Sequence, residues 1–411
     1  MNDPGNRQRG SILLLFALSL VTVFLILGMS VDVGTAYVTH SRLSQSVDAG
    51  VLAGARSSAQ GNAKMEAVAL QVAKANYVAG TPVSYAVKIT TPARDTKRVS
   101  LTASTKAPNR FSASVFGAKS MNVSVEAEAT RYPLDLSLVL DVSYSLQRNQ
   151  VFDDMQRAAI SFLNYFDDSA DQVGIASYST WAMENLPVQK NFRLRGRRVI
   201  RRMRAISDTN IQEGLRVSKD QLDVAIQRPG ALKIAVLFTD GRPTAYRDPN
   251  FTFSGRACRR YDAIAAAYGN GYWFRGLFRK TDGRKILSFR RRCRTRTTTN
   301  LSYANSVMPI EVGRHGSPGD FIRQQGIVQA EAQANAMRAA GYSIYSIALG
   351  NPNATYPFER PDLAFLARLT NQNGQTNPAQ PRGELIFAPT GAQLEDAFAK
   401  LADRLLTRLT R

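Results

Sequence analysis

Two aspartates and two serines stand where oxygen atoms could gather around a cation. Asp141 ends the apolar run LDLSLVLD and is followed by Ser143 and Ser145, and Asp240 closely follows a second apolar run. Carboxylate and hydroxyl oxygens, with no sulfur or imidazole among them, are hard ligands that suit Mg²⁺, Mn²⁺ or Ca²⁺. The pattern predicts a divalent-metal site, with Mg²⁺ as the first choice and Mn²⁺ or Ca²⁺ as alternatives.

The cysteine and histidine content excludes most other site chemistries. The chain has two cysteines, Cys258 and Cys293, and two histidines, which excludes CxxC-type zinc or iron–sulfur sites and leaves little for a Ser/His/Asp triad. We find no nucleophile with a positioned base and therefore expect no enzymatic activity. In an exported domain the two cysteines could form one disulfide, and the alternative is a pair of unrelated free thiols.

Three apolar runs provide the framework that must position these oxygens. The first ends at Asp141, the second just before Asp240 and the third at Leu349, while helical patterns cover 330–340 and 392–409. Strands that alternate with helices predict an α/β fold with a doubly wound, mostly parallel, Rossmann-like sheet. Ligands of such sheets bind at the carboxyl ends of the strands. Both aspartates lie at such ends, so we expect their carboxylates to converge.

The segment 132–411 resembles a von Willebrand factor type A domain. The resemblance rests on the DVSYS motif that begins at Asp141, on the string SDTNIQEGL and on the string FTDG. It implies a metal-ion-dependent adhesion site with the ligand set Asp141, Ser143, Ser145, Thr209 and Asp240. In that family the hydroxyl groups bind the metal directly, the aspartates bind directly or through water, and an acidic group of a partner completes the shell.

Two residues depart from the family pattern. Asp208 stands where glycine is common, and Tyr144 replaces a residue that is usually small. We expect Asp208 either to add a ligand or to distort its loop. The alternative to a working site is a vestigial one on an intact fold.

An uncharged segment near the amino terminus has the length of a membrane span. Residues 11–31 carry no charged side chain and are rich in Leu, Val, Ile and Phe, which matches the roughly 20 apolar residues that a spanning helix needs. Arg7 and Arg9 precede the segment, so the positive-inside rule predicts a cytoplasmic amino terminus, 1–10. One alternative is a cleaved signal peptide, although no convincing cleavage site follows. Another is a type IV prepilin, whose characteristic Glu is replaced by Leu15.

The next two segments are expected to lie outside the cytoplasm. Residues 32–80 continue the helix as a stalk, and the string VDVGTAYVTHSRLSQSVDAGVLAGA resembles the amino-terminal segment of TadG-like proteins of Tad/Flp pilus assembly. From 83 to 130 the hydrophobic period changes to two, which predicts a small β-rich region. This region is either a packing surface for envelope partners or a spacer.

The net charge of +21 is concentrated in two basic segments. Residues 190–204 hold eight Lys or Arg and no acid, and residues 256–296 hold thirteen against two aspartates. The second segment lies inside an insertion of the type A domain, 242–321. Such charge predicts an anionic partner, either an acidic protein, a lipid or a polymer, while export disfavours nucleic acid. The alternative is a solvated loop. The arginines assigned to this surface are Arg197, Arg198, Arg201, Arg202, Arg290, Arg291 and Arg292.

Together these features predict a non-enzymatic envelope protein of Tad/Flp-type pilus assembly. We expect a single-pass protein of the inner membrane, with its amino terminus in the cytoplasm and its type A domain in the periplasm or outside the cell. Its metal site would bind a protein partner that presents an acidic group. The alternative is a surface or periplasmic adhesin or receptor that binds an acidic ligand and has no part in pili.

Overall fold

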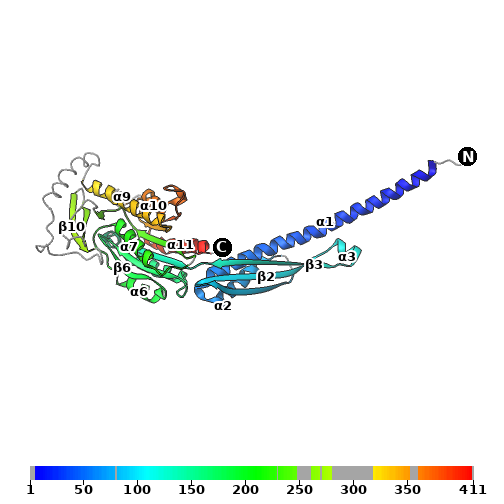
Figure 1. Cartoon of the computed structure of the whole chain (residues 1–411), viewed down its shortest axis with the longest axis horizontal. Helices are drawn as coiled ribbons and strands as arrows, with labels where there is room; N and C mark the ends of the chain where they lie inside the picture. Colours follow the sequence, from blue (N-terminus) through cyan, green and yellow to red (C-terminus); the bar gives the residue numbers. More distant parts are fainter. Residues whose placement is uncertain are drawn as a thin grey trace. The chain divides into compact units, whose positions relative to one another are not determined.

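The computed structural model describes residues 5–78, 81–228, 230–247, 261–268, 271–279, 318–351 and 360–409. The chain forms two compact units, one from Met1 to Arg131 and one from Tyr132 to Leu409. In Figure 1 the colours run from blue to cyan in the first unit and onward to red in the second.

The first unit is built on one long helix, α1 (Gly5–Arg56). The apolar side chains of its first part are exposed, with Leu14 at 64% and Phe24 at 61%. A helix satisfies its own backbone hydrogen bonds, which is the condition for crossing hydrocarbon. By length and composition α1 could cross a membrane, and a signal sequence has the same properties.

The later part of α1 packs against a second helix and a small sheet. The helix is α2 (Asn62–Asn76), and the antiparallel sheet has the order β1 (Val83–Ala93), β2 (Thr96–Pro108), β3 (Ser120–Arg131). The small β-rich segment predicted from the period-two pattern is therefore present. A short helix, α3 (Phe111–Phe116), connects β2 to β3 at the tip of their hairpin (Figure 1). The core side chains include Leu43, Val47, Val51, Met65, Val99, Leu101 and Val123.

Two glycines allow α1 and α2 to approach closely. A Cβ on Gly54 would lie 2.8 Å from the Cβ of Ala69 and 2.9 Å from the carbonyl oxygen of Met65. A Cβ on Gly50 would lie 2.8 Å from the carbonyl oxygen of Ala69. Their spacing of four places both on one helix face, so the contact depends on the absence of side chains there.

Replacing Gly54 with valine should destabilise the first unit by roughly 1–3 kcal/mol, because the helices must separate to admit the side chain. Resistance of this unit to protease at rising temperature, in the full chain in detergent, measures the loss. Gly34→Val is the matched control on the same helix, since nothing lies within 4 Å of a Cβ at Gly34. Equal losses in the two variants would contradict the packing argument.

The second unit is a six-stranded sheet with helices on both faces, as Figure 1 shows. The strand order is β12-β11-β7-β4-β5-β6, and every pairing is parallel except that of β6 with β5. This confirms the doubly wound, mostly parallel sheet predicted from the sequence. The strands are β4 (Leu134–Asp141), β5 (Gln172–Tyr178), β6 (Ala182–Gln189), β7 (Leu232–Thr239), β11 (Ser343–Leu349) and β12 (Leu385–Ala388).

Helices bury both faces of this sheet. One face is covered by α5 (Phe152–Phe162), α6 (Phe192–Arg202) and α11 (Leu394–Leu409). The other is covered by α7 (Ile211–Val224), α9 (Pro318–Ala339) and α10 (Leu363–Thr370). A sheet buried on both faces explains why β4, β5 and β11 are continuously buried along their length. Among the described residues, the other short helices are α4 (Tyr144–Arg148), η2 (Leu163–Tyr165), η5 (Gln372–Gly374) and η6 (Gly391–Gln393) in the second unit and η1 (Ser57–Gln60) in the first.

The described part of the 242–321 insertion contains regular structure. Three strands, β8 (Ala245–Arg247), β9 (Tyr261–Tyr268) and β10 (Gly271–Arg279), form an antiparallel sheet in the order β10-β9-β8. Helix α9 begins at Pro318, well before the pattern at 330–340 that predicted it. Cys258 and Cys293 lie outside the described residues.

Candidate metal centre

The two aspartates lie at the carboxyl ends of adjacent parallel strands. Asp141 is the last residue of β4, and Asp240 follows the last residue of its neighbour β7. Both are buried, with Asp141 at 0% and Asp240 at 5% exposed. The order of the strands alone therefore brings together two carboxylates that are far apart in the sequence.

Hydrogen bonds join these aspartates to the two serines. The backbone N–H of Ser143 donates to Oδ1 of Asp141 at 2.8 Å. The hydroxyl groups of Ser143 and Ser145 are 2.9 Å apart, and Ser145 donates to Oδ1 of Asp240 at 2.8 Å. Four of the five residues predicted as ligands thus form one connected group.

Two further residues fix the Asp141 carboxylate. Its Oδ2 accepts a hydrogen bond from Thr239 Oγ1 at 2.9 Å. The hydroxyl of Tyr178 lies 3.3 Å from the same oxygen and 3.0 Å from the carbonyl oxygen of Phe238, and its one proton is shared between these two acceptors. Burial and the charge of Asp141 raise the pKa of Tyr178, so the phenol stays protonated and able to donate. Neither residue was predicted as part of the site from the sequence. The sequence feature that could have predicted them is a polar side chain at the end of an otherwise apolar strand.

The hydrogen-bond donors around Asp141 and Asp240 do not fully balance the negative charge of the two carboxylates. Burial raises the pKa of Asp141 to about 6, and burial together with the charge of Asp141 raises the pKa of Asp240 to about 7. Oδ2 of Asp240 is buried without a hydrogen-bond partner. A buried acceptor without a partner is costly unless a cation or donor reaches it. The residues therefore fit a hard divalent cation.

The donor set agrees with this fit. The described part of the chain contains no group of three or more His, Cys, Asp or Glu side chains that could hold a metal. Any site here depends on hydroxyl oxygens beside the two carboxylates, which favours Mg²⁺, Ca²⁺ or Mn²⁺ over softer metals.

Backbone contacts bring Thr209 to the same edge of the sheet. Its carbonyl oxygen accepts the N–H of Thr244 at 2.8 Å, and its own N–H donates to Thr244 Oγ1 at 2.8 Å. The N–H of the next residue, Asn210, donates to the carbonyl of Ser179 at 2.7 Å. Thr209 is therefore held between the end of β5 and the loop that follows Asp240.

The two departures from the family pattern are accommodated locally. Oδ2 of Asp208 accepts hydrogen bonds from Thr180 Oγ1 at 2.9 Å and from Ser207 Oγ at 3.1 Å. Its carboxylate is thus engaged with side chains of this loop and of the segment after β5. Tyr144 is 57% exposed, so its bulk lies in solvent. Ser207 has a positive φ of 54°, so the backbone of this loop adopts a left-handed conformation at that residue.

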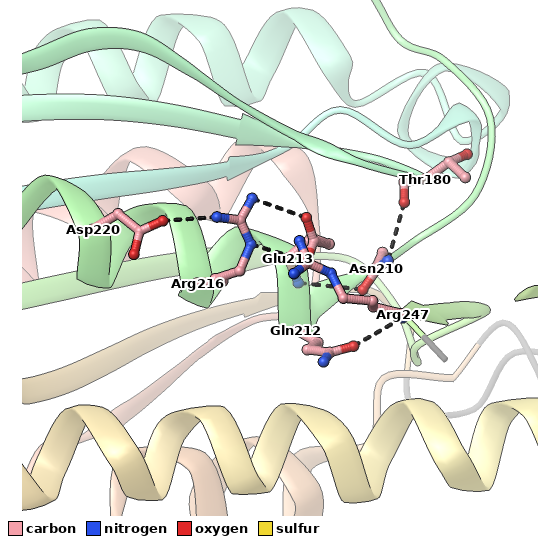
Figure 2. Close-up of polar contacts among 7 residues, drawn as sticks. All are labelled: Thr180, Asn210, Gln212, Glu213, Arg216, Asp220 and Arg247. Atoms are coloured by element: carbon pink, nitrogen blue, oxygen red, sulfur yellow. Dashed lines mark hydrogen bonds and ion pairs between the residues drawn. The ribbon is translucent and has the colours of Figure 1, made fainter. Parts of the chain in front are cut away.

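A network at the start of α7, drawn in Figure 2, holds the Thr209 loop. Asn210 caps the helix by accepting the N–H of Glu213 at 3.2 Å, and its amide donates to the carbonyl of Thr180 at 3.0 Å. Glu213 pairs with Nη2 of Arg216 at 3.0 Å and Nη2 of Arg247 at 2.6 Å. The signal missed in the sequence is the spacing of Asn210 and Glu213, which is close to that of a capping box.

Glu213→Gln should destabilise the second unit by about 1–3 kcal/mol near neutral pH, because two partly buried arginines lose their counter-charge. Burial raises the pKa of Glu213, but Arg247 and Arg216 outweigh it, and the net pKa is lowered. The stabilisation is therefore present above the ordinary value of 4.5 and is lost as the pH falls below it toward the folded-state pKa.

Urea unfolding of the fragment 132–411 at about pH 7 and about pH 3.5 measures this difference. The difference in the free energy of unfolding between the wild type and Glu213→Gln should be smaller at the lower pH. A difference that stays constant would mean that the glutamate charge does not contribute.

The first basic segment forms an exposed helical face. Helix α6 buries Phe192, Gly196 and Ile200 against the sheet. Its opposite side carries four of the arginines predicted as an anionic-partner surface. These exposed residues are Arg197, Arg198, Arg201 and Arg202. The remaining three, Arg290, Arg291 and Arg292, lie outside the described residues.

Solved structures similar to this chain include proteins of several pili. The PilB minor pilin from Streptococcus sanguinis is 14% identical with a TM-score of 0.45, over 80% of this chain and 79% of that one. The pilus adhesin SpaC from Lactobacillus rhamnosus GG is 13% identical with a TM-score of 0.41, over 79% and 35%. The vWF domain of the type V pili tip protein Mfa5 from Porphyromonas gingivalis is 14% identical with a TM-score of 0.40, over 68% and 97%. Likeness at this level concerns the fold alone.

Two family models match separate parts of the sequence. The model described as putative Flp pilus-assembly TadE/G-like matches residues 10–57, and the model of the von Willebrand factor type A domain matches residues 135–277. No curated protein matches the sequence. The chain therefore joins a TadE/G-like Flp pilus-assembly segment to a von Willebrand factor type A domain, the combination of the TadG-like proteins that its sequence resembles.

Proposed function

We propose that this chain is a non-enzymatic, membrane-anchored envelope protein of Tad/Flp-type pilus assembly, which binds a protein partner through a divalent metal. The observation that carries the proposal is the connected group of Asp141, Ser143, Ser145 and Asp240, with an unpartnered buried oxygen on Asp240. This group lies in a chain whose amino terminus matches a pilus-assembly family.

Each residue of the site has a role in this proposal. Ser143, Ser145 and Thr209 hold the metal through their hydroxyl oxygens, and Asp141 and Asp240 hold it directly or through water. Mg²⁺ is the preferred ion, and it supplies a positive centre that attracts an acidic group of the partner. Three hydroxyl groups cannot complete six-coordination, so a partner carboxylate has a position to fill. The site then serves binding rather than turnover, because among the residues that the structure describes no further base or nucleophile is positioned beside it.

The amino-terminal helix supports a membrane anchor with a defined orientation. Residues 11–31 form the apolar part of α1, and Arg7 and Arg9 precede it. The positive-inside rule places these arginines in the cytoplasm and the type A domain on the other side of the inner membrane. The exposed arginines of α6 then face an envelope compartment, where they suit an acidic protein or anionic polymer.

The test is a complementation experiment in the source organism with the native copy deleted. Ser143→Ala/Ser145→Ala should keep a normal level of the protein, lose assembled pili and lose a Mg²⁺-dependent, chelator-sensitive crosslink to a partner. Asp208→Asn is the matched control, since its carboxylate is engaged with Thr180.

Two outcomes would overturn the proposal in different ways. Normal pili in the double-serine variant would show that assembly does not use the metal site. Normal pili together with lost attachment of cells to a surface would favour an adhesin or receptor that binds an acidic ligand.

A further inference from the structure

The hairpin tip of the first unit, residues 109–121, lies against the apolar part of α1. Asp32 is 3% exposed, and its carboxylate accepts the backbone N–H groups of Arg110 at 2.7 Å, Phe111 at 3.0 Å and Ser112 at 2.6 Å. These three residues form the start of α3, which Figure 1 shows beside α1. The tip is therefore attached at the residue where the apolar segment 11–31 ends.

A second contact reaches into the apolar segment itself. A Cβ on Gly28 would lie 2.2 Å from the ring of Phe111, so this ring packs on bare helix backbone one turn before Asp32. At 1.5 Å per residue, Gly28 lies about 4–5 Å inside the end of the apolar segment. Helices that lie in a membrane interface bury their apolar face by roughly 5–10 Å, and the Gly28 contact lies at the shallow end of that range.

The contact at Asp32 also lowers the free-energy cost of placing an ionised carboxylate at the end of the apolar segment. Hydrogen bonds from Ser112, and from the backbone of Phe111 and Arg110, hold the pKa of Asp32 well below its usual range. The carboxylate stays ionised and is covered by peptide donors rather than by hydrocarbon, where a charge is costly. The tip is thus fixed to α1 by a polar and an apolar contact.

The outer side of the tip has the composition of an interfacial segment. Phe116 is 63% exposed, Val115 is 49% exposed and Met121 is 39% exposed. Arg110 and Lys119 flank α3 and are also exposed. Residues 109–121 contain no acidic side chain. Exposed apolar groups flanked by cations are typical of segments that bind anionic phospholipid surfaces.

We propose that the hairpin tip is a second membrane contact, in which Val115 and Phe116 insert into the outer leaflet of the bilayer that α1 spans and Arg110 and Lys119 meet lipid phosphates. The occupant is the phospholipid surface because the tip is continuous with the apolar segment of α1. This inference rests on the proposed membrane anchor. Its consequence is that the first unit has two fixed points at the membrane instead of one.

The test uses the full chain in vesicles of phosphatidylethanolamine and phosphatidylglycerol, with tryptophan placed at single positions. Phe116→Trp reports the tip, Leu20→Trp reports the anchor and Val78→Trp is an exposed control. Ser46 donates to the carbonyl of Ala73 in α2, and Ser46 lies about 20 Å along α1 beyond Val31. Val78 follows Ala73 by five residues, which span at most about 12 Å, so Val78 stays roughly 10 Å beyond the apolar segment. The unchanged chain gives the background of its two native tryptophans.

Brominated lipids should quench the added fluorescence of Phe116→Trp and Leu20→Trp but not that of Val78→Trp. Quenching at Leu20 with Phe116→Trp behaving like the control would overturn the tip contact and leave the anchor intact. No quenching at Leu20 would overturn both. Arg110→Glu/Lys119→Glu should at least halve the quenching at Phe116 without changing that at Leu20, and unchanged quenching would overturn the phosphate contact.

Discussion

Replacing Asp240 with asparagine should abolish saturable Mg²⁺ binding by the fragment 132–411. Asparagine keeps the size of the side chain and an oxygen that can accept from Ser145, but it removes the charge and the unpartnered Oδ2. We expect affinity to fall by at least about 100-fold, since loss of an outer partner of a metal ligand alone costs roughly 10–100-fold. Isothermal titration measures the binding.

The same substitution should have the opposite effect on the metal-free domain. Asp240 and Asp141 are both buried, and each raises the cost of ionising the other. Removing one charge should stabilise the metal-free fragment by on the order of 1 kcal/mol in urea unfolding with chelator present. Asp208→Asn is the control, which should bind Mg²⁺ as the wild type does. Binding that survives in Asp240→Asn would exclude this residue from the site.

Arg228→Met should destabilise the second unit by about 3–5 kcal/mol, because it leaves a buried carboxylate without its cation. Nη2 of Arg228 lies 2.5 Å from Oδ1 of Asp135, and the two side chains are 1% and 0% exposed. Arg228 also donates to the carbonyl oxygens of Leu134, at 2.7 Å, and Ala170. Burial raises the pKa of Asp135, and this effect outweighs the opposing effect of Arg228.

Urea unfolding of the fragment 132–411 measures this loss. The double variant Arg228→Met/Asp135→Asn should recover part of it, because the unpaired charge is gone. Arg157→Met removes an exposed ion pair with Asp154 and should cost no more than about 1 kcal/mol. Similar losses of unfolding free energy in Arg228→Met and Arg157→Met would show that burial does not determine how much an ion pair stabilises the unit.

The sequence predicted those parts of the fold that a continuous hydrophobic pattern marks. The runs that end at Asp141 and just before Asp240 are strands, and the period-two pattern of 83–130 is a sheet. Strand β6 has mixed burial and pairs antiparallel at the edge, where pattern is weak. The first half of α9 was missed because its string PGDFIRQQGIVQ mixes polar and apolar residues without a clear period.

The residues of the candidate metal centre also fall into those that the sequence predicted and those that it did not. Asp141, Ser143, Ser145 and Asp240 were predicted because they follow strand ends, and the structure joins them by hydrogen bonds. Tyr178 was missed because its role depends on which strand lies beside β4. No local pattern contains that information, since neighbours in a parallel sheet are set by the order of crossovers.

The bond between Ser145 and Asp240 joins residues 95 positions apart, and this separation bears on when the proposed site could acquire an ion. A chain that crosses the membrane unfolded has no such site, because β4 and β7 are not yet adjacent. Metal uptake must then follow folding in the compartment where the domain arrives. Which ion occupies the centre is decided there by supply as much as by ligand chemistry. If the domain is exported and binds a metal as proposed, a loaded centre would also report that the domain has finished folding.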